Sequence, residues 1–452
     1  MIGVSLSRWT LSFFAAALVA LLIAEALMAV GFGYPNVPVD APETLALVHI
    51  VTIGWLSLLM CGALLQFLPV LVAQPLYSNA LALPALASLV VGLVSLVCGF
   101  MQLAGHAAGI HFPFFAAAAG LLGLGFVLVI WNLVRTMIAA PERPISALFV
   151  IIGLISALFT VGLGAVFALV LGGLAESPAL VDLMVLGLPA HIIAGLAGWL
   201  TFTAIGVSYR LLAMFMLAPD LDGPTTRIVF WLGTAALILA IPGGIIAVLA
   251  GADLNIVLLA ALALAVIALA CYGHDAVSLF RRRKRPKIEL NSRTAAFALA
   301  SFAATILLGL GLLVAGKFQA LAGSVLFLAA FGWLSGLGLS QLYKIIAFMT
   351  WLECYGPVLG KAPTPRVQDL VVERRAIKWF ALYFLSVWVG TILLLFEYAP
   401  GFRIAALLML VATSGIVAQL LKTRRLVDVV APQGGERFPE GAHLPHLLVS
   451  HS

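Results

Sequence analysis

Twelve apolar stretches of about 20 or more residues constrain this chain more than any other feature of its sequence. Such stretches cross the hydrocarbon core of a bilayer as helices, because a helix satisfies its own backbone polar groups. Of the 452 residues, 63% are apolar and only 9% are charged, a composition that excludes a soluble protein. We predict an all-α polytopic membrane protein with twelve transmembrane helices, at about residues 9–33, 45–73, 80–104, 113–138, 145–173, 180–217, 227–250, 254–280, 294–316, 318–351, 376–397 and 401–421.

A short motif, Gly-Trp-Leu followed by Ser or Thr, occurs in three of these stretches. It occupies residues 54–57, 198–201 and 332–335, at separations of about 140 residues. A motif repeated at a near-constant period indicates internal triplication. We therefore predict three four-helix pseudo-repeats within a membrane domain of residues 1–430. Their approximate ranges are 1–139, 140–290 and 291–430, and the equivalent tryptophans are Trp55, Trp199 and Trp333.

The same register continues beyond the motif. Gly62, Gly206 and Ser340 each lie eight residues after the first glycine of their motif. Three equivalent units of this kind predict a ring with approximate threefold symmetry, in which the three motif helices are the inner elements.

The basic residues predict the orientation of the helices. All but two of the 24 Lys and Arg residues, Lys317 and Arg403, fall in segments that the twelve-helix plan puts on one side. By the positive-inside rule that side, with both termini, is cytoplasmic. We expect an integral protein of a prokaryotic cytoplasmic membrane, with residues 431–452 as a polar, disordered cytoplasmic tail. Its expected partners are the lipid bilayer and possible membrane proteins, with no nucleic acid.

Two histidines within the predicted helices, His49 and His191, are candidates to bind a cofactor, because an intramembrane imidazole is costly unless it has a partner. Glycines 187, 195 and 198 share a helical face with His191 and form a groove that admits either a neighbouring helix or a flat cofactor. Ligation and helix packing both remain open for each histidine. His106 and His111, in the loop before the fourth helix, are either metal ligands or exposed loop residues.

Glu25 is the one carboxylic acid inside a helix interior, so it should be protonated or have a partner. The first helix turns back into the second near His49, which makes a hydrogen bond between Glu25 and His49 plausible. The alternative is a protonated Glu25 bonded to the backbone.

The pattern resembles subunit I of the haem-copper oxidases, and most closely the branch of the cbb3-type oxidases and nitric oxide reductases. The resemblance rests on twelve helices in three four-helix arcs, on one histidine in each of helices two and six, and on the run from His49 to Gly54-Trp55. It implies that His49 is a ligand of the low-spin haem and that His191 is a ligand of copper. Trp55, Trp199, Trp333 and Glu25 would support these sites.

The sequence lacks most of the ligands that the resemblance implies. Residues 225–250 contain no histidine pair for copper, and residues 318–351 contain no histidine to bind either haem. Val325 and Phe327 stand at the positions that correspond to His191 and His49. We therefore expect no reduction of oxygen or nitric oxide. A degenerate relative that binds haem or copper in an accessory, sensing or metal-handling role fits the sequence, and the alternative is a cofactor-free transporter of a small solute or lipid.

The predicted orientation can be tested with reporter fusions along the chain. A fusion within residues 281–287 should report the cytoplasm, because this loop holds a run of basic residues, and a fusion at residues 106–111 should report the opposite side. We expect His49 and His191 to lie in the outer part of the membrane, and the reverse pattern would contradict this depth together with the orientation.

Overall fold

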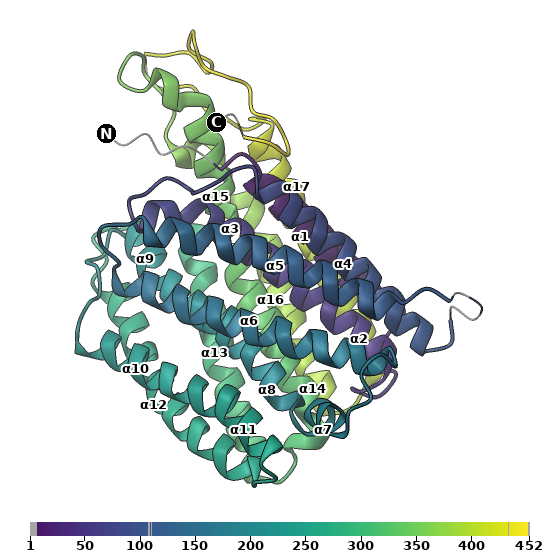
Figure 1. The fold of residues 1–452 in the computed structure, drawn as a ribbon. Helices are drawn as coiled ribbons and strands as arrows, with labels where there is room; N and C mark the ends of the chain where they lie inside the picture. The colour runs from purple at the N-terminus through teal and green to yellow at the C-terminus, as the bar shows by residue number, and fades with distance from the viewer. Residues whose placement is uncertain (1–6, 107–108, 110, 433, 451–452) are drawn as a thin grey trace. The chain divides into compact units, whose positions relative to one another are not determined.

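The computed structural model describes residues 7–106, 109, 111–432 and 434–450. Within these residues the secondary structure is helical, apart from one isolated bridge between Leu359 and Ala362 (Figure 1). Twelve helical segments of this part are long and apolar enough to cross a membrane. The structure thus confirms an all-helical chain of the composition expected for an integral membrane protein.

Eight of the twelve candidate spans are single α-helices in the described residues. They are α1 (Thr10–Val30), α4 (Ala82–Leu103), α5 (Phe114–Ile138), α6 (Ile145–Leu171), α12 (Leu254–Arg281), α13 (Leu290–Val314), α16 (Glu373–Leu395) and α17 (Ala399–Arg424).

The other four candidate spans each contain a π-helical segment between α-helices. They are α2 (Pro42–His49), η1 (Ile50–Ser57) and α3 (Leu58–Leu71); α8 (Leu188–Ile192), η2 (Ile193–Phe202) and α9 (Thr203–Met216); α10 (Pro224–Ile238), η3 (Leu239–Gly243) and α11 (Gly244–Leu249); and α14 (Phe318–Phe327), η4 (Leu328–Ser335) and α15 (Gly336–Tyr355). The last span continues through the 3-10 turn η5 (Gly356–Val358).

Each copy of the Gly-Trp-Leu-Ser/Thr motif coincides with one of these π segments. Residues 54–57 end η1, residues 198–201 lie in η2, and residues 332–335 end η4. The fourth π segment, η3, contains Pro242, whose missing N–H accounts for a shifted hydrogen-bond ladder without any motif. The three motif copies thus share a local backbone structure that the repeat alone did not predict.

The sixth apolar stretch is shorter as a span than the sequence predicted. Residues 180–217 were expected to form one helix, but α7 (Pro178–Leu186) is separate and the span begins at Leu188. Gly187 caps α7, and Pro189 follows in the first turn of α8. Proline lacks an N–H and its ring would clash with a preceding helical carbonyl, so a continuous helix through this point is disfavoured.

The chain divides into two compact units. One comprises Met1–Gly62 and Glu289–Ser452, and the other comprises Ala63–Ile288. The boundary at Glu289 lies next to a predicted repeat boundary, whereas the boundary at Gly62 falls inside a helical span. The packing of the described residues therefore distinguishes two compact units and does not distinguish three repeats.

In the first unit, helices from opposite ends of the chain pack together. α1 lies against both η1 and α17, which are coloured at opposite ends of the bar in Figure 1. The first and third motif copies also meet, because the indole Nε1 of Trp55 donates a hydrogen bond of 2.7 Å to Ser335 Oγ. Both side chains are fully buried.

In the second unit, α6 packs against η2 and α9, and α4 and α5 form an antiparallel pair. α10 packs along α12. This arrangement gives η2 the same kind of neighbour as η1 has in the first unit, namely the candidate span that immediately precedes it in the chain.

Residues 434–450 contact residues at the ends of α1, α15 and α17. The Ser12 hydroxyl donates to the Leu448 carbonyl at 2.6 Å, and the Ser450 amide donates to the Arg8 carbonyl at 3.0 Å. Arg424 of α17 forms a buried ion pair with Glu353 of α15 and also donates to the His446 carbonyl at 2.6 Å. A buried guanidinium needs several acceptors, and the tail supplies one of them.

The positions eight residues after the motif glycine make close contact with the preceding span. A Cβ on Gly206 would lie 2.2 Å from Cβ of Phe149 on α6, and a Cβ on Gly62 would lie 2.8 Å from Cβ of Phe13 on α1. Both glycines are thus sites of close helix approach, as small residues are in membrane proteins. The first two motif copies thus share this contact, and equivalence of all three stays a prediction.

We predict different effects on stability for two glycine substitutions in the second unit. Gly206→Ala should lower the unfolding free energy by about 1–3 kcal/mol, because the added methyl overlaps the stem of Phe149. Gly162→Ala on α6, where a Cβ would meet nothing within 4 Å, should leave stability unchanged or raise it by up to about 1 kcal/mol. Thermal unfolding of the two variants in detergent measures both, and equal effects would contradict the packing described.

Candidate functional site

His49 lies directly before a π segment. It is the last residue of α2, and η1 begins at Ile50. Its Nδ1 is 2.7 Å from the Leu45 carbonyl oxygen, a contact that places the proton on Nδ1 and leaves the lone pair of a neutral ring on Nε2. A metal-binding histidine is commonly oriented by such a bond from its other nitrogen. The side chain is half-buried.

His191 lies two residues before η2, in α8, and packs against α6. Its Cε1 would be 3.1 Å from a Cβ on Gly164, and its ring centroid is 5.4 Å from that of Phe167. The imidazole therefore fits beside α6 at a position where that helix has no side chain.

The glycine groove beside His191 is filled by the same helix. A Cβ on Gly195 would lie 3.2 Å from the Thr160 methyl, and one on Gly198 would lie 2.5 Å from Ser156. Residues 156, 160 and 164 follow one face of α6 at a helical spacing. Of the two occupants that the sequence allowed for this groove, the structure places a helix there.

The two loop histidines are both exposed and lie between α4 and α5. His106 is in the turn after α4, and His111 precedes α5. Among the described residues, no group of three or more His, Cys, Asp or Glu side chains lies close enough together to hold a metal ion. Binding of a metal by His106 and His111, or by His191, stays a prediction.

Glu25 is fully buried and is bonded to α17 rather than to His49. Thr413 Oγ1 donates to Glu25 Oε1 at 2.8 Å, while Glu25 Oε2 has no hydrogen-bond partner in the described residues. The hydrogen bond expected between Glu25 and His49 is thus not formed, because Glu25 accepts from Thr413 and His49 Nδ1 bonds to Leu45 within α2. A half-satisfied carboxyl group inside an apolar span is an unusual feature that can serve function.

A second buried carboxylate, Asp275 of α12, is fully satisfied by hydroxyl groups. It accepts hydrogen bonds from Thr225 at 2.6 Å, Tyr209 at 2.9 Å and Thr226 at 3.1 Å. The carboxylate thereby joins α9, α10 and α12. The sequence alone did not predict this cluster.

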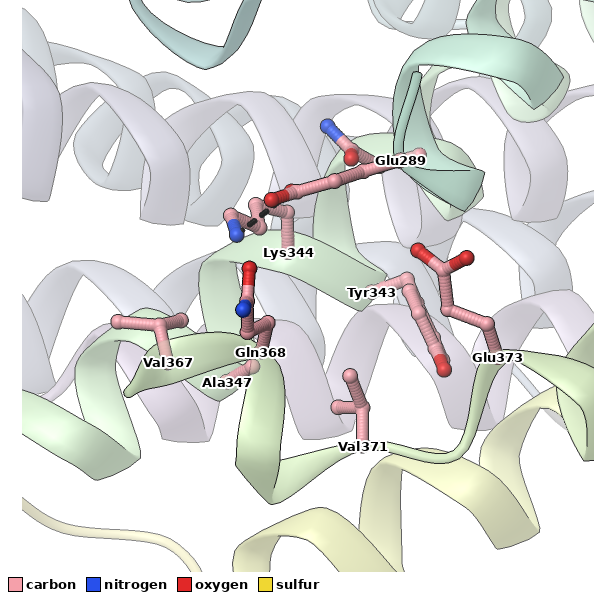
Figure 2. Close-up of a pocket in the computed structure, with 9 residues that line it drawn as sticks. Glu289, Tyr343, Lys344, Ala347, Val367, Gln368, Val371 and Glu373 are labelled. Carbon is pink, nitrogen blue, oxygen red and sulfur yellow. Dashed lines mark ion pairs between the residues drawn. The ribbon is translucent and has the colours of Figure 1, made fainter. Parts of the chain in front are cut away.

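A pocket in the first unit is lined by charged and amide side chains from α13, α15 and the segment leading into α16 (Figure 2). Lys344 Nζ pairs with Glu289 Oε2 at 2.7 Å, and Glu373 pairs with Arg293 at 3.1 Å. The cavity volume of the pocket is about 10 Å³, far below the roughly 300–1,000 Å³ of organic ligand sites. Its charges are balanced by ion pairs, so it joins helices rather than offering a cofactor site.

The three motif tryptophans are all buried but have different polar environments. Trp55 donates to Ser335, Trp333 stacks on Phe302 at 4.4 Å between centroids, and Trp199 meets Phe126 edge-on at 6.4 Å. Their shared burial fits a common supporting role. None of these contacts is to a histidine.

Outside the spans, the loop after α1 is held against α14. The ring of Tyr34 fills the space that a Cβ on Gly323 would occupy, with Cζ 2.5 Å from that position. Burial raises the pKa of Tyr34 above its ordinary value, and the nearby Glu397 carboxylate raises it further. The phenol is therefore neutral at physiological pH.

The chain matches no protein-family model and no curated protein. The functional argument therefore depends on the residues of the site itself. His49 is the histidine whose local geometry fits a ligand, Glu25 is the half-satisfied intramembrane acid, and His191 is packed against α6.

Proposed function

We propose that this protein has the plan of haem-copper oxidase subunit I, with three four-helix repeats, but lacks the catalytic pair of metal centres. His49 holds a haem iron or a copper ion, and the protein acts in an accessory, sensing or metal-handling role in a prokaryotic cytoplasmic membrane. The observation that carries the proposal is the position of His49 at the start of η1, with Nδ1 bonded to Leu45. π segments inside α-helices often occur at functional sites.

The residues present fit one coordinated group and do not fit two. His49 has the oriented imidazole that a ligand requires. A copper centre of the family's kind needs three imidazoles, and no such group occurs among the described side chains. α14, the helix of the first unit that would supply haem ligands in the family, has phenylalanine at position 327, and its ring packs against Phe331 and Phe402.

A haem held by a single imidazole keeps an open coordination position, which allows binding of a small gas or transfer of one electron. His49 would hold and orient the iron, and the bond to Leu45 would fix the ring and increase its basicity. Trp55 and its bond to Ser335 would hold η1 in place behind the ligand.

The proposal predicts a spectroscopic difference between two histidine variants. Protein purified from haem-replete cells should show a Soret band or bound copper, and His49→Ala should lose it. His191→Ala should keep it, because the ring of His191 packs against α6. His274→Ala, with a side chain 73% exposed, is the matched control. The measurements are an optical spectrum and metal analysis of each preparation.

Colourless, metal-free wild-type protein would contradict this function. Loss of the band in His191→Ala with retention in His49→Ala would show that His191, and not His49, is the ligand. Because one imidazole cannot hold both metals, reduced protein should not consume oxygen or nitric oxide faster than the His191→Ala variant does.

A second function, cofactor-free transport of a small solute or lipid, is favoured by Glu25. Its unpartnered Oε2 in the middle of α1 is the kind of group through which transporters couple a proton to a solute. Transport of a defined solute into proteoliposomes that survives His49→Ala and His191→Ala but is lost in Glu25→Gln would support this function over the first.

A further inference from the structure

The run of residues 281–287 forms a dense group of positive charges at the end of α12. Six of its seven residues are Lys or Arg, and all except Arg285 are exposed. α12 ends at Arg281, and Arg283 donates to the Phe280 carbonyl at 2.7 Å, which satisfies one of the last carbonyls of the helix.

The backbone of this run is held against the end of a second membrane helix. The amides of Lys284 and Arg285 donate to the carbonyls of Leu217 and Met216, each at 3.4 Å. Leu217 caps α9 in the left-handed conformation. The cations are therefore presented at the shared end of α9 and α12 rather than on a loop that extends away from it.

The acidic groups near this end already have partners. Asp220 pairs with Arg210, Asp222 lies 3.7 Å from Arg227, and Asp275 accepts three hydroxyl hydrogen bonds. Among the described residues, no ion pair involves the side chains of the following four exposed members of the run: Arg281, Arg282, Lys284 and Lys287. The positive charges of these four residues are thus not neutralised by ion pairs in the described part of the protein.

Large apolar side chains are exposed on the helices that carry or adjoin these cations. Val277 of α12 is 50% exposed, Leu217 is 54% exposed, and Trp231 of α10 is 67% exposed. The bonds from Thr225 and Thr226 to Asp275 place the start of α10 beside this end of α12. Exposed apolar side chains close to unpaired cations match the boundary between acyl chains and headgroups.

We propose that residues 281–287 form a binding surface for the phosphate of anionic phospholipid headgroups. The guanidinium and ammonium groups donate to the lipid phosphate, and Val277, Leu217 and Trp231 contact the acyl chains and the interface beside it. A nucleic acid could satisfy the charges but not the apolar residues next to them. This inference is independent of the cofactor proposed at His49.

The test is an equilibrium titration of the detergent-purified full chain with four probes, namely short-chain phosphatidylglycerol, short-chain phosphatidylcholine, inorganic phosphate and a single-stranded oligonucleotide. Phosphatidylglycerol should bind at least about tenfold more tightly than phosphatidylcholine. The preference should shrink when salt rises from about 0.05 M to about 0.5 M, because the cations are exposed.

Two variants with equal changes in charge locate the surface. The first neutralises the unpaired cations of the run and retains Arg283 and Arg285: Arg281→Gln, Arg282→Gln, Lys284→Gln and Lys287→Gln. The second neutralises four exposed cations outside the run: Lys361→Gln, Arg366→Gln, Arg374→Gln and Arg425→Gln. The first should lose at least about tenfold in affinity for phosphatidylglycerol and the second less than about threefold.

Equal losses in the two variants, or no preference of the wild type for phosphatidylglycerol, would overturn the proposal. Tighter binding of the oligonucleotide than of the lipid would assign the surface to nucleic acid, and equally tight binding of inorganic phosphate would show that the lipid is not selected. Should the first variant fail to fold, Arg281→Gln with Arg282→Gln must weaken phosphatidylglycerol binding more than Arg366→Gln with Arg374→Gln does, and equal effects would overturn the proposal.

Discussion

In hydrocarbon, every backbone N–H and C=O must find a partner within the protein, and the structure depends on how its π segments meet this requirement. A π segment shifts the hydrogen-bond ladder and frees carbonyl groups from their usual donors. In η4 these carbonyls receive side chains: Ser335 donates to the Ala330 carbonyl at 2.6 Å, and Tyr383 donates to the Phe331 carbonyl at 2.9 Å. Trp55 then donates to Ser335. The motif serine and the motif tryptophan thus stabilise an irregular backbone at membrane depth.

This requirement also explains why small residues and hydroxyl groups surround the motif. Gly198 and Gly332 lie against Ser156 and Ser301, the serines that α6 and α13 present to η2 and η4. Close backbone approach replaces the hydrophobic driving force that is missing between helices in lipid. A histidine placed at the start of such a segment is held by a rigid backbone, which is what a ligand needs. His49 meets this condition, whereas His191 uses the same location to pack against α6.

The sequence predicted the helical spans well, because apolar length alone identifies a membrane helix. It predicted the sixth span less well, since the break at Gly187 and Pro189 lies within an apolar run. The repeated motif predicted three equivalent positions but not their π geometry, because no composition signal distinguishes an i−5 from an i−4 hydrogen bond. Asp275 was missed because its three hydroxyl partners come from helices that sequence alone cannot place side by side. Glu25 was identified as needing a partner, but its partner Thr413 is nearly 400 residues away.

The central claim is that the motif helices are equivalent elements, each packed in the same register against the span that precedes it. Comparing the destabilisation caused by Gly62→Ala with that caused by Gly206→Ala tests this most directly. Both should lower the unfolding free energy by about 1–3 kcal/mol, because each added methyl overlaps the Cβ of the phenylalanine opposite, Phe13 or Phe149, while Gly120→Ala, where a Cβ would meet nothing within 4 Å, should not. Destabilisation by one of the two substitutions without the other would show that the two helices do not share a register, and the claim would fail.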